Sequence, residues 1–203
     1  MGKEIFDKGI AEAMLAVMQL KNEDNLNFLE LVSEAIASCF RLGHKLIIAG
    51  NGGSCCDAAH FAEELTGYFR EKRPALPAIA LSEPGHITCV GNDLGFDYVF
   101  SRGVEAYGKE GDIFIGLTTS GNSKNLIHAF EEAQKRGLTT VAFLGKGGGK
   151  LKGYADFEMI IEGFKTSDRI QEVHMTAIHM IIQRVEEKLF EEKALQHGTY
   201  KEG

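Results

Sequence analysis

The segment Ile113-Phe-Ile-Gly-Leu-Thr-Thr-Ser-Gly-Asn-Ser123 contains the transition that decides the fold. Its first residues, Ile113–Leu117, form a continuous apolar run after Gly111-Asp112, which is typical of a strand buried on both faces. Hydroxyl-bearing and small side chains follow, and apolar residues then recur at helical spacing from Leu126 until Gly137. The segment therefore predicts a strand, a hydroxyl-rich turn and a helix.

The hydroxyl-rich turn has the composition of a phosphate-binding loop. Backbone N–H groups at a helix start carry partial positive charge, and Gly121 lets the backbone approach a ligand closely. No Lys or Arg lies inside the turn, so binding would depend on dipoles and on hydroxyl donors. An ordinary turn in which one serine caps the helix is the alternative, but a cap needs only one hydroxyl. The candidate phosphate-binding side chains are Thr118, Thr119, Ser120 and Ser123.

Strands and helices alternate along the chain from Lys45 onward. The other strand candidates are Leu46–Ala49, Ala78–Leu81, Val141–Leu144 and Phe157–Ile161. Between them lie Cys55–Phe69, Pro84–Val90, Tyr98–Tyr107, Ser123–Arg136 and a glycine-rich turn at Gly145–Gly153, and a last helix is expected from about Ser167 to Glu192. This alternation predicts an α/β fold with a parallel five-stranded sheet flanked by helices. Ligands of such sheets lie beyond the carboxyl ends of the strands.

Two further helices are expected before the first strand, at about Glu4–Leu20 and Asn25–Leu42. They do not belong to the alternating unit, and their apolar faces predict that they cap the sheet or pack against another subunit. We therefore expect one domain with N-terminal helices in about residues 1–42 and an α/β core in about 45–192. The polar tail, 193–203, is expected to be disordered.

Composition excludes several classes of protein. The chain has 203 residues, 44% of them hydrophobic, and a formal net charge of −7, without a basic cluster for nucleic acid or a membrane surface. No apolar run is long enough to span a bilayer, and no signal-peptide pattern is present. The cysteines have no CxxC spacing, so we expect reduced thiols and a cytoplasmic protein.

Two glycine-rich segments imitate nucleotide-binding motifs. Gly50-Asn51-Gly52-Gly53-Ser54 follows the first strand but lacks G-x-G-x-x-G spacing, so a tight turn lining the same pocket explains it better. Gly145–Lys150 fails the Walker pattern because Leu151 follows the lysine, and we interpret it as a flexible turn.

Two helices carry candidate catalytic groups. His60 and Glu64, four residues apart, share one helix face and suit either a general base with its partner or a zinc site. A solvated surface pair is the alternative, but apolar neighbours indicate burial nearby. Gln171 and His179 lie roughly 80° apart around the last helix and can face one cavity. A hydrogen-bonded core histidine is the alternative for His179. His174 lies on the other side of Gln171, so we expect it to be a packing or surface residue.

Asn92 and Asp93 precede Leu94-Gly95 in a predicted turn between helices. An Asx turn completed by Gly95 explains them structurally. Contact with sugar hydroxyls is the functional alternative, and the spacing leaves both open.

Several sequence blocks form one larger pattern: Gly50–Ser54, His60–Gly67, Val90–Asp93, Phe100–Arg102, Thr119–Ser123 and Asp168–His174, followed by His179. Together they resemble the phosphoheptose isomerase family of the sugar isomerase (SIS) domain superfamily. The resemblance covers nearly the whole chain and is strongest from about Ala35 to Leu189. It implies a flavodoxin-like or Rossmann-like three-layer SIS domain with extra N-terminal helices. Thr118 stands where many members have Ser, and Tyr68 stands where Arg is common.

The resemblance also implies a function. Members convert sedoheptulose 7-phosphate to D-glycero-D-manno-heptose 7-phosphate through an enediol-type intermediate, in the heptose biosynthesis that supplies lipopolysaccharide. They form homotetramers with sites at subunit boundaries, and some hold zinc. The implied catalytic residues are Glu64 and His179, and the implied zinc ligands are His60, Glu64, Gln171 and His179. The implied substrate-binding residues are Asn51, Gly52, Gly53, Ser54, Asn92, Asp93, Thr118, Thr119, Ser120, Ser123, Asp168 and Gln171.

Two other functions remain open at this point. A related SIS protein is a non-enzymatic tetramer that associates with the bacterial replication initiator, although Glu64, Gln171 and His179 favour an enzyme here. An isomerase or sensor for another sugar phosphate is the second alternative, because the phosphate loop does not distinguish the length of the sugar.

Overall fold

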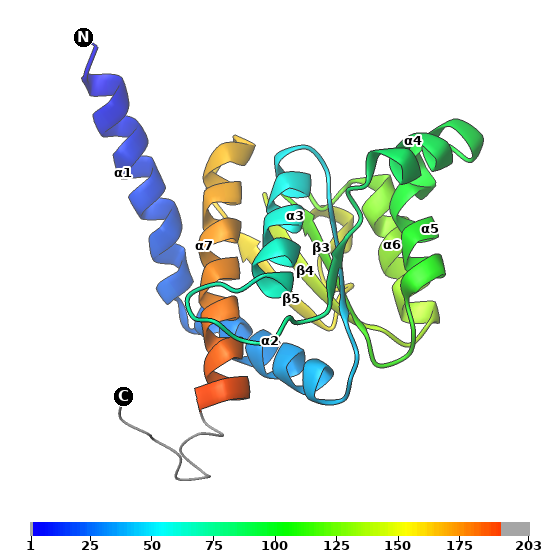
Figure 1. Ribbon diagram of the computed structural model, residues 1–203. Helices are drawn as coiled ribbons and strands as arrows, with labels where there is room; N and C mark the ends of the chain where they lie inside the picture. Colours follow the sequence, from blue (N-terminus) through cyan, green and yellow to red (C-terminus); the bar gives the residue numbers. More distant parts are fainter. Residues whose placement is uncertain (1, 192–203) are drawn as a thin grey trace.

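The strands lie where the apolar runs predict them in the computed structural model, which describes residues 2–191. They are β1 (Leu46–Gly50), β2 (Ala78–Ala80), β3 (Ile113–Thr118), β4 (Thr139–Gly145) and β5 (Phe157–Ile161). Every neighbouring pair is parallel, and the order across the sheet is β2-β1-β3-β4-β5. The prediction of a parallel five-stranded sheet flanked by helices is confirmed (Figure 1).

The helices also follow the sequence pattern, with changes at their ends. They are α1 (Glu4–Met18), α2 (Glu23–Arg41), α3 (Gly53–Thr66), α4 (Pro84–Asp93), α5 (Val99–Tyr107), α6 (Lys124–Lys135) and α7 (Ser167–Glu186). Short 3-10 turns occupy Gln19–Lys21, Phe96–Tyr98 and Gly149–Leu151, and a π-helical turn at Glu187–Glu191 extends α7. The tail expected to be disordered, 193–203, lies outside the described residues.

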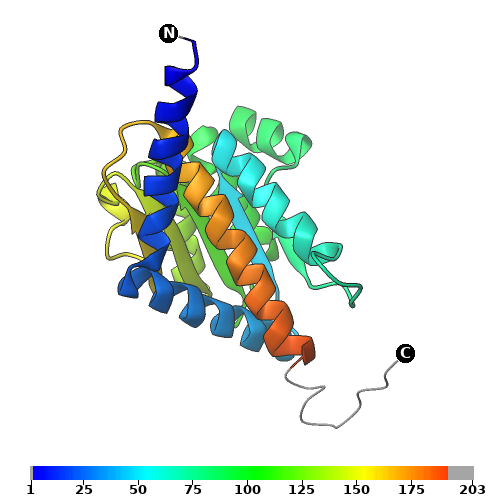
Figure 2. The same ribbon diagram turned by 90° about the vertical axis from the view of Figure 1, so that its left-hand side faces the viewer.

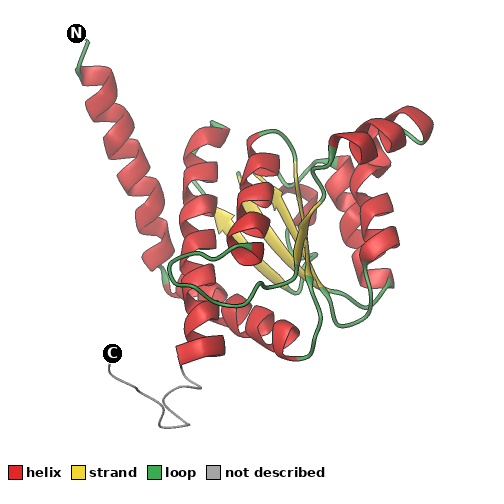
Figure 3. Ribbon diagram, viewed as in Figure 1, coloured by secondary structure: helices red, strands yellow, loops and turns green. Residues whose placement is uncertain are grey.

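Alternation of side chains along the strands creates two cores, one on each face of the sheet. Leu46 and Ile48 of β1 belong to the core beneath α2, α3 and α7, whereas Ile47 and Ala49 face α5 and α6. Figure 2 shows α7 lying between α1 and α3, with α2 crossing near its end. Helices therefore cover both faces of the yellow strands in Figure 3, which gives the three-layer architecture.

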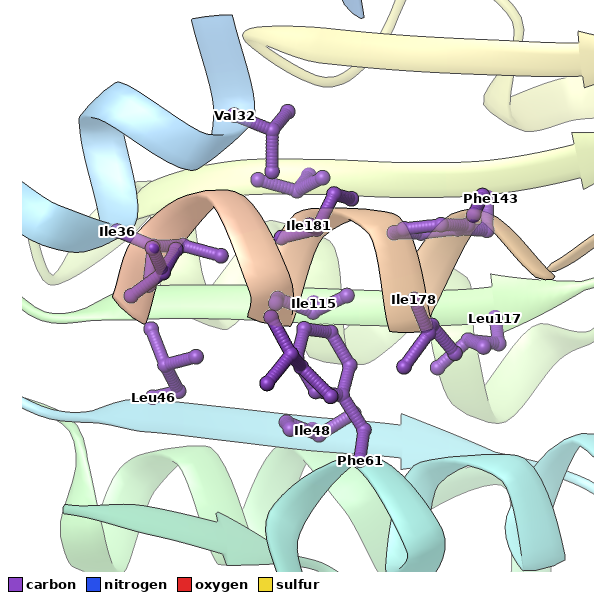
Figure 4. Packing of buried hydrophobic residues seen from close by; sticks show 14 of the residues in the cluster. Val32, Ile36, Leu46, Ile48, Phe61, Ile115, Leu117, Phe143, Ile178 and Ile181 are labelled. Carbon is purple, nitrogen blue, oxygen red and sulfur yellow. The ribbon is translucent and has the colours of Figure 1, made fainter. Parts of the chain in front are cut away.

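The last helix supplies much of the larger core. Ile178 and Ile181 of α7, together with Phe61 of α3, lie over Ile115 and Leu117 of β3 (Figure 4). All of these side chains are fully buried. The packing fixes α3 and α7 against the same strands, and these two helices carry the candidate catalytic groups.

Helix α1 leaves most of its apolar side chains in contact with solvent. Ile5, Phe6, Ile10, Met14 and Leu15 are each at least 59% exposed, although α1 contacts α7. Within residues 2–191, no helix combines the length and apolar character needed to cross a membrane.

The strand order identifies the edge where a ligand can enter. The chain passes from β1 outward to β2 and then returns to β3 on the other side of β1, so the connections after β1 and β3 diverge. Such a reversal opens a crevice beyond the carboxyl ends of the two strands. The segments Asn51–Gly53 and Thr118–Ser123 flank this crevice.

Candidate active site

A cavity of about 300 Å³ occupies the crevice between the ends of β1 and β3. It lies at the beginnings of α3 and α7, so backbone N–H groups and hydroxyls converge on it. Its walls contain most of the predicted phosphate-binding residues; the lining residues are Asn51, Gly52, Gly53, Ser54, Leu117, Thr118, Thr119, Ser120, Ser123, Ser167 and Gln171. The cavity has the donor groups that an anion requires.

Hydrogen bonds among the hydroxyls hold this wall in shape. Thr118 Oγ1 lies 3.4 Å from Ser123 Oγ and accepts from the backbone N–H of Gly121 at 3.3 Å. Ser123 precedes the first residue of α6, but its side chain makes no capping hydrogen bond. Thr119 Oγ1 lies 3.0 Å from Ser167 Oγ at the start of α7. The hydroxyls thus form a connected surface rather than a simple helix cap.

The glycine-rich loop after β4 packs directly against the Thr118–Ser123 loop. The backbone N–H of Leu151 donates to Gly121 O at 3.1 Å, and that of Lys150 donates to Asn122 Oδ1 at 3.2 Å. A Cβ atom added to Gly121 would lie 1.7 Å from Gly148 O. Gly121 also has φ +63°, a left-handed conformation that glycine adopts without strain. Interpreting Gly145–Lys150 only as a flexible turn missed this structural role.

Replacing Gly121 with Ala is expected to lower the affinity for inorganic phosphate at least tenfold and to destabilise the fold by about 2 kcal/mol. The reason is the clash with Gly148 O, which must push two loops apart. Gly147→Ala is the matched control, because Gly147 has φ +80° but a methyl group there would meet no atom within 4 Å. Calorimetry with phosphate and thermal unfolding measure the two effects. Equal behaviour of the two variants would exclude the loop contact as the cause.

Gln171 of α7 contacts the start of α3 inside the hydroxyl-lined cavity. Its Nε2 donates to Ser54 Oγ at 3.2 Å, and a Cβ on Gly53 would lie 2.7 Å from its Oε1. The absence of a side chain at Gly53 therefore makes room for the Gln171 amide. Asn51 also lines the cavity, but its amide exchanges two hydrogen bonds of 2.9 Å with Asn125.

His60, Glu64 and His179 form a compact cluster beside this cavity. His60 Nε2 lies 3.1 Å from Glu64 Oε1 and 3.4 Å from His179 Nε2. Among residues 2–191, these are the His, Cys, Asp and Glu side chains whose ligand atoms converge within 4.8 Å of one another. Tetrahedral zinc with bonds of about 2.0–2.1 Å places its ligands about 3.3 Å apart. The donor atoms and their separations fit a zinc ion.

Aromatic packing and burial keep His179 oriented and neutral. The Phe69 ring stacks on the His179 ring with centroids 5.4 Å apart and an interplanar angle of 27°. Burial lowers the pKa of His179, and the neighbouring His60 lowers it further, although Glu64 opposes this shift. A neutral imidazole is the form that binds metal or accepts a proton.

A second cavity, of about 630 Å³, continues from this cluster along α7. Gln171 and His179 both line it, which agrees with the angle predicted from their spacing; the full lining is Asp57, Asp168, Gln171, Glu172, Met175, Thr176 and His179. Gln171 lines both cavities, so the hydroxyl-rich site is adjacent to the cavity that His179 of the His–Glu–His cluster lines.

Asn92 and Asp93 are not part of either cavity, so the structure does not bring them to the other predicted substrate contacts. The prediction that they lie in a turn is wrong, because α4 continues through Asp93 and the turn forms at Gly95, with φ +103°. Their side chains bond to each other, with Asn92 Nδ2 donating to Asp93 Oδ1 at 2.8 Å.

Three lining or packing residues escaped the sequence analysis: Asp57, Phe69 and Ser167. Asp57 lies three residues before His60 on the same helix, a spacing that could have indicated it. Burial raises the pKa of its carboxyl to about 6, and its Oδ2 is buried without a hydrogen-bond partner within residues 2–191. Ser167 carried a weaker signal, because a serine at a helix start is common.

Arg73 links α3 and α7, the two helices that carry His60, Glu64 and His179. Its guanidinium donates to the carbonyl oxygens of Glu64 and Leu65 at 2.8 Å each, at the end of α3. The same group pairs with Glu186 of α7 at 2.6 Å, and both side chains are largely buried. This ion pair holds the carboxyl end of α3 against α7.

Comparisons with known proteins agree with this geometry. The SIS domain family model matches residues 9–145. Phosphoheptose isomerase from Fusobacterium nucleatum is 56% identical over 177 residues, which cover 87% of this chain and 91% of that protein. The chain belongs to the phosphoheptose isomerase family. The family member from Yersinia enterocolitica is 51% identical over 170 residues, 84% of this chain and 88% of that protein.

Solved structures of the family share the fold. The phosphoheptose isomerase from Francisella tularensis superposes with a TM-score of 0.85 at 32% sequence identity. The match covers 91% of this chain and 98% of that one. The resemblance inferred from the sequence motifs is confirmed at the level of family and fold.

Proposed function

We propose that this protein is an aldose–ketose isomerase that converts sedoheptulose 7-phosphate to D-glycero-D-manno-heptose 7-phosphate, the step that supplies heptose for lipopolysaccharide. The observation that carries the proposal is that the two cavities are adjacent and share Gln171 as a lining residue. A hydroxyl-lined anion site then lies on one side, and a His–Glu–His cluster lies on the other. A sugar phosphate has this polarity, with a charged end and a reacting end.

The reacting end needs a group that moves a proton between two carbon atoms. Glu64 takes a proton from C1 of the open-chain ketose to give an enediol and returns it to C2 to give the aldose. Its side chain is 20% exposed, so it is partly shielded from water but accessible to a substrate.

The oxygen atoms need a separate proton carrier. His179, when its lone-pair nitrogen is not occupied by metal, exchanges a proton with O1 and O2 as the carbonyl changes position, because a neutral imidazole can accept a proton at that nitrogen. The stack on Phe69 keeps its ring directed at the cluster. Each such group contributes about 10²–10⁴-fold to the rate.

The phosphate end supplies positioning rather than chemistry. Ser54, Thr119, Ser120 and Ser123 surround the cavity with hydroxyl donors, and the starts of α3 and α7 add helix dipoles. Binding energy from this distant anchor holds C1 and C2 against the proton-transfer groups.

The proposed cofactor is one zinc ion per subunit, held by His60, Glu64, His179 and Gln171. When bound, zinc would supply Lewis-acid polarisation of the sugar oxygens near the reacting carbons. The separations of 3.1 Å and 3.4 Å between their ligand atoms support the first three. Gln171 is proposed as the fourth because it lines the cavity next to His179.

The proposed assembly is a homotetramer. Its support is the apolar surface of α1, on which Ile5, Phe6 and Met14 are at least 65% exposed. Side chains of this size gain free energy when a second copy covers them. Light scattering on the purified protein should give four times the chain mass, and a monomer mass would contradict the assembly.

The deciding experiment is an assay of purified protein with sedoheptulose 7-phosphate, run as isolated, after a strong chelator, and after re-addition of zinc. The expected result is formation of an aldoheptose 7-phosphate that falls with chelation and returns with zinc. Full activity after complete metal removal would retain the isomerase and reject the cofactor. No turnover under any of the three conditions, with the assembly intact, would reject the isomerase and favour a sugar-phosphate-binding protein.

A further inference from the structure

Lys146 is the one residue other than glycine in 2–191 that adopts a positive φ, +51°. It follows β4 in the glycine-rich loop that supports the phosphate loop. A lysine in this left-handed conformation carries backbone strain that glycine would not. In this conformation the Lys146 side chain lies at the sheet edge that holds the hydroxyl-lined cavity, where it reaches Ser167.

The Lys146 ammonium is directed at the cavity wall. Its Nζ donates to Ser167 Oγ at 3.4 Å, and Ser167 Oγ lies 3.0 Å from Thr119 Oγ1. Ser167 and Thr119 both line the phosphate cavity. A phosphate that bonds to the Ser167 hydroxyl would therefore be separated from the Lys146 ammonium by a single hydroxyl group.

No acidic side chain in the described part of the chain neutralises this charge. Among the side chains described for residues 2–190, none of the carboxylates forms an ion pair with Lys146 Nζ, whereas Lys124 pairs with Asp97 and Lys135 with Glu132. Among the same residues, Ser167 uses one of the three ammonium donors of Lys146 and leaves two. The unused donors and the uncompensated charge are available to an anion.

We propose that Lys146 is a phosphate-binding residue, which supplies from the loop after β4 the formal positive charge that the Thr118–Ser123 loop lacks. The proposal deepens the proposed function, on which it rests, by assigning recognition of a dianionic phosphate monoester to a cation as well as to dipoles. Lys146 touches only the phosphate end, so it contributes to substrate affinity and leaves the proton transfers unchanged.

The first test measures binding of inorganic phosphate by calorimetry, which needs no turnover. Lys146→Gln is expected to weaken binding about tenfold, because it removes a charge-assisted hydrogen bond. Lys146→Arg, which keeps the charge, should stay within about threefold of the parent protein. Lys152→Gln is the matched control from the same loop, since Lys152 is exposed like Lys146 but, within the described residues, lacks the contact with Ser167 that Lys146 makes; its affinity should be unchanged.

A glycine variant separates the effect of the Lys146 charge from the effect of its backbone strain. Lys146→Gly removes the ammonium but accepts φ +51° without strain, so it should bind phosphate as weakly as Lys146→Gln while remaining at least as stable as the parent. Parent-like phosphate affinity in Lys146→Gly or Lys146→Gln would overturn the assignment. Absence of phosphate binding to the parent protein would overturn it as well.

Turnover distinguishes this proposal from the isomerase proposal. In Lys146→Gln, KM for sedoheptulose 7-phosphate should rise about tenfold while kcat stays within about twofold. An active parent whose KM is unaffected by the substitution rejects the role of Lys146 and keeps the isomerase. A parent that binds phosphate through Lys146 but does not turn over the heptulose rejects the isomerase and keeps the phosphate site.

Discussion

Glu64→Gln is expected to lower the turnover of sedoheptulose 7-phosphate by about 10²–10⁴-fold, the largest effect of any single change considered. Glutamine preserves the size of the side chain but cannot accept a proton from carbon. It also replaces an oxygen that lies 3.1 Å from His60 Nε2 in the proposed zinc site. The measurement is the initial rate of aldoheptose 7-phosphate formation, together with the zinc content of the same preparation.

The neighbouring residue provides the control. Glu63 lies on the same helix with an oxygen 3.8 Å from His60 Nε2, but its side chain is 67% exposed. Glu63→Gln makes the same chemical change and should retain at least half of the activity. If Glu64→Gln keeps full zinc and loses activity, proton transfer is the lost function. Parent-like turnover by Glu64→Gln would exclude Glu64 as the base.

Acid is expected to destabilise the protein through His174, which is fully buried on α7 beneath the sheet edge. Its Nε2 lies 3.0 Å from Leu144 O, and its Nδ1 has no hydrogen-bond partner within residues 2–191. Burial lowers the pKa of His174 from 6.5 to about 4. The folded state therefore keeps this imidazole neutral, as befits the packing residue that its place on the helix predicts.

The direction in which stability changes with pH follows from the number of protons that the folded and unfolded chains bind. Between pH 6.5 and about pH 4 the unfolded chain binds a proton at His174 and the folded chain does not, so stability rises with pH. The contribution is complete above pH 6.5 and is lost as the pH falls toward 4. The shift in pKa corresponds to about 3 kcal/mol.

A non-titrating variant isolates this contribution from the carboxylates. His174→Gln keeps a donor for Leu144 O, and its stability should depend less steeply on pH across this interval than that of the parent. Urea unfolding at about pH 7 and at about pH 4.5 measures the difference. Identical slopes for the parent and the variant would show that His174 titrates normally in the folded state.

Sequence patterns predicted the central strands best, because burial of β1 and β3 on both faces leaves a clear apolar run in each. Ile113–Leu117 became β3 with one added residue, Thr118. Helix ends were less predictable, since α4 could continue through Asn92 and Asp93 until Gly95 supplied a positive φ.

The candidate site was predictable only where its residues lie on the same helix. Spacing along one helix connects His60 with Glu64, and Gln171 with His179, but nothing in the sequence measures the distance between the two helices. The structure supplies the 3.4 Å between His60 and His179. Likewise, the contact between Ser167 and Thr119 joins residues 48 positions apart. Phe69 and Lys146 make such contacts, with His179 and Ser167 respectively, and were therefore missed.

The central position of α7 has a consequence for how the chain is made. The helix packs against α1, α2 and α3, and it carries Gln171 and His179, but the ribosome releases it after every strand and all the other α-helices of residues 2–191. Until it emerges, α2 and α3 contact strands of the sheet but lack the partner that α7 provides. The part of the larger core that α7 covers therefore stays incomplete until α7 is made. The His60–Glu64–His179 cluster needs His179 of α7, so it forms only when α7 completes this part of the core.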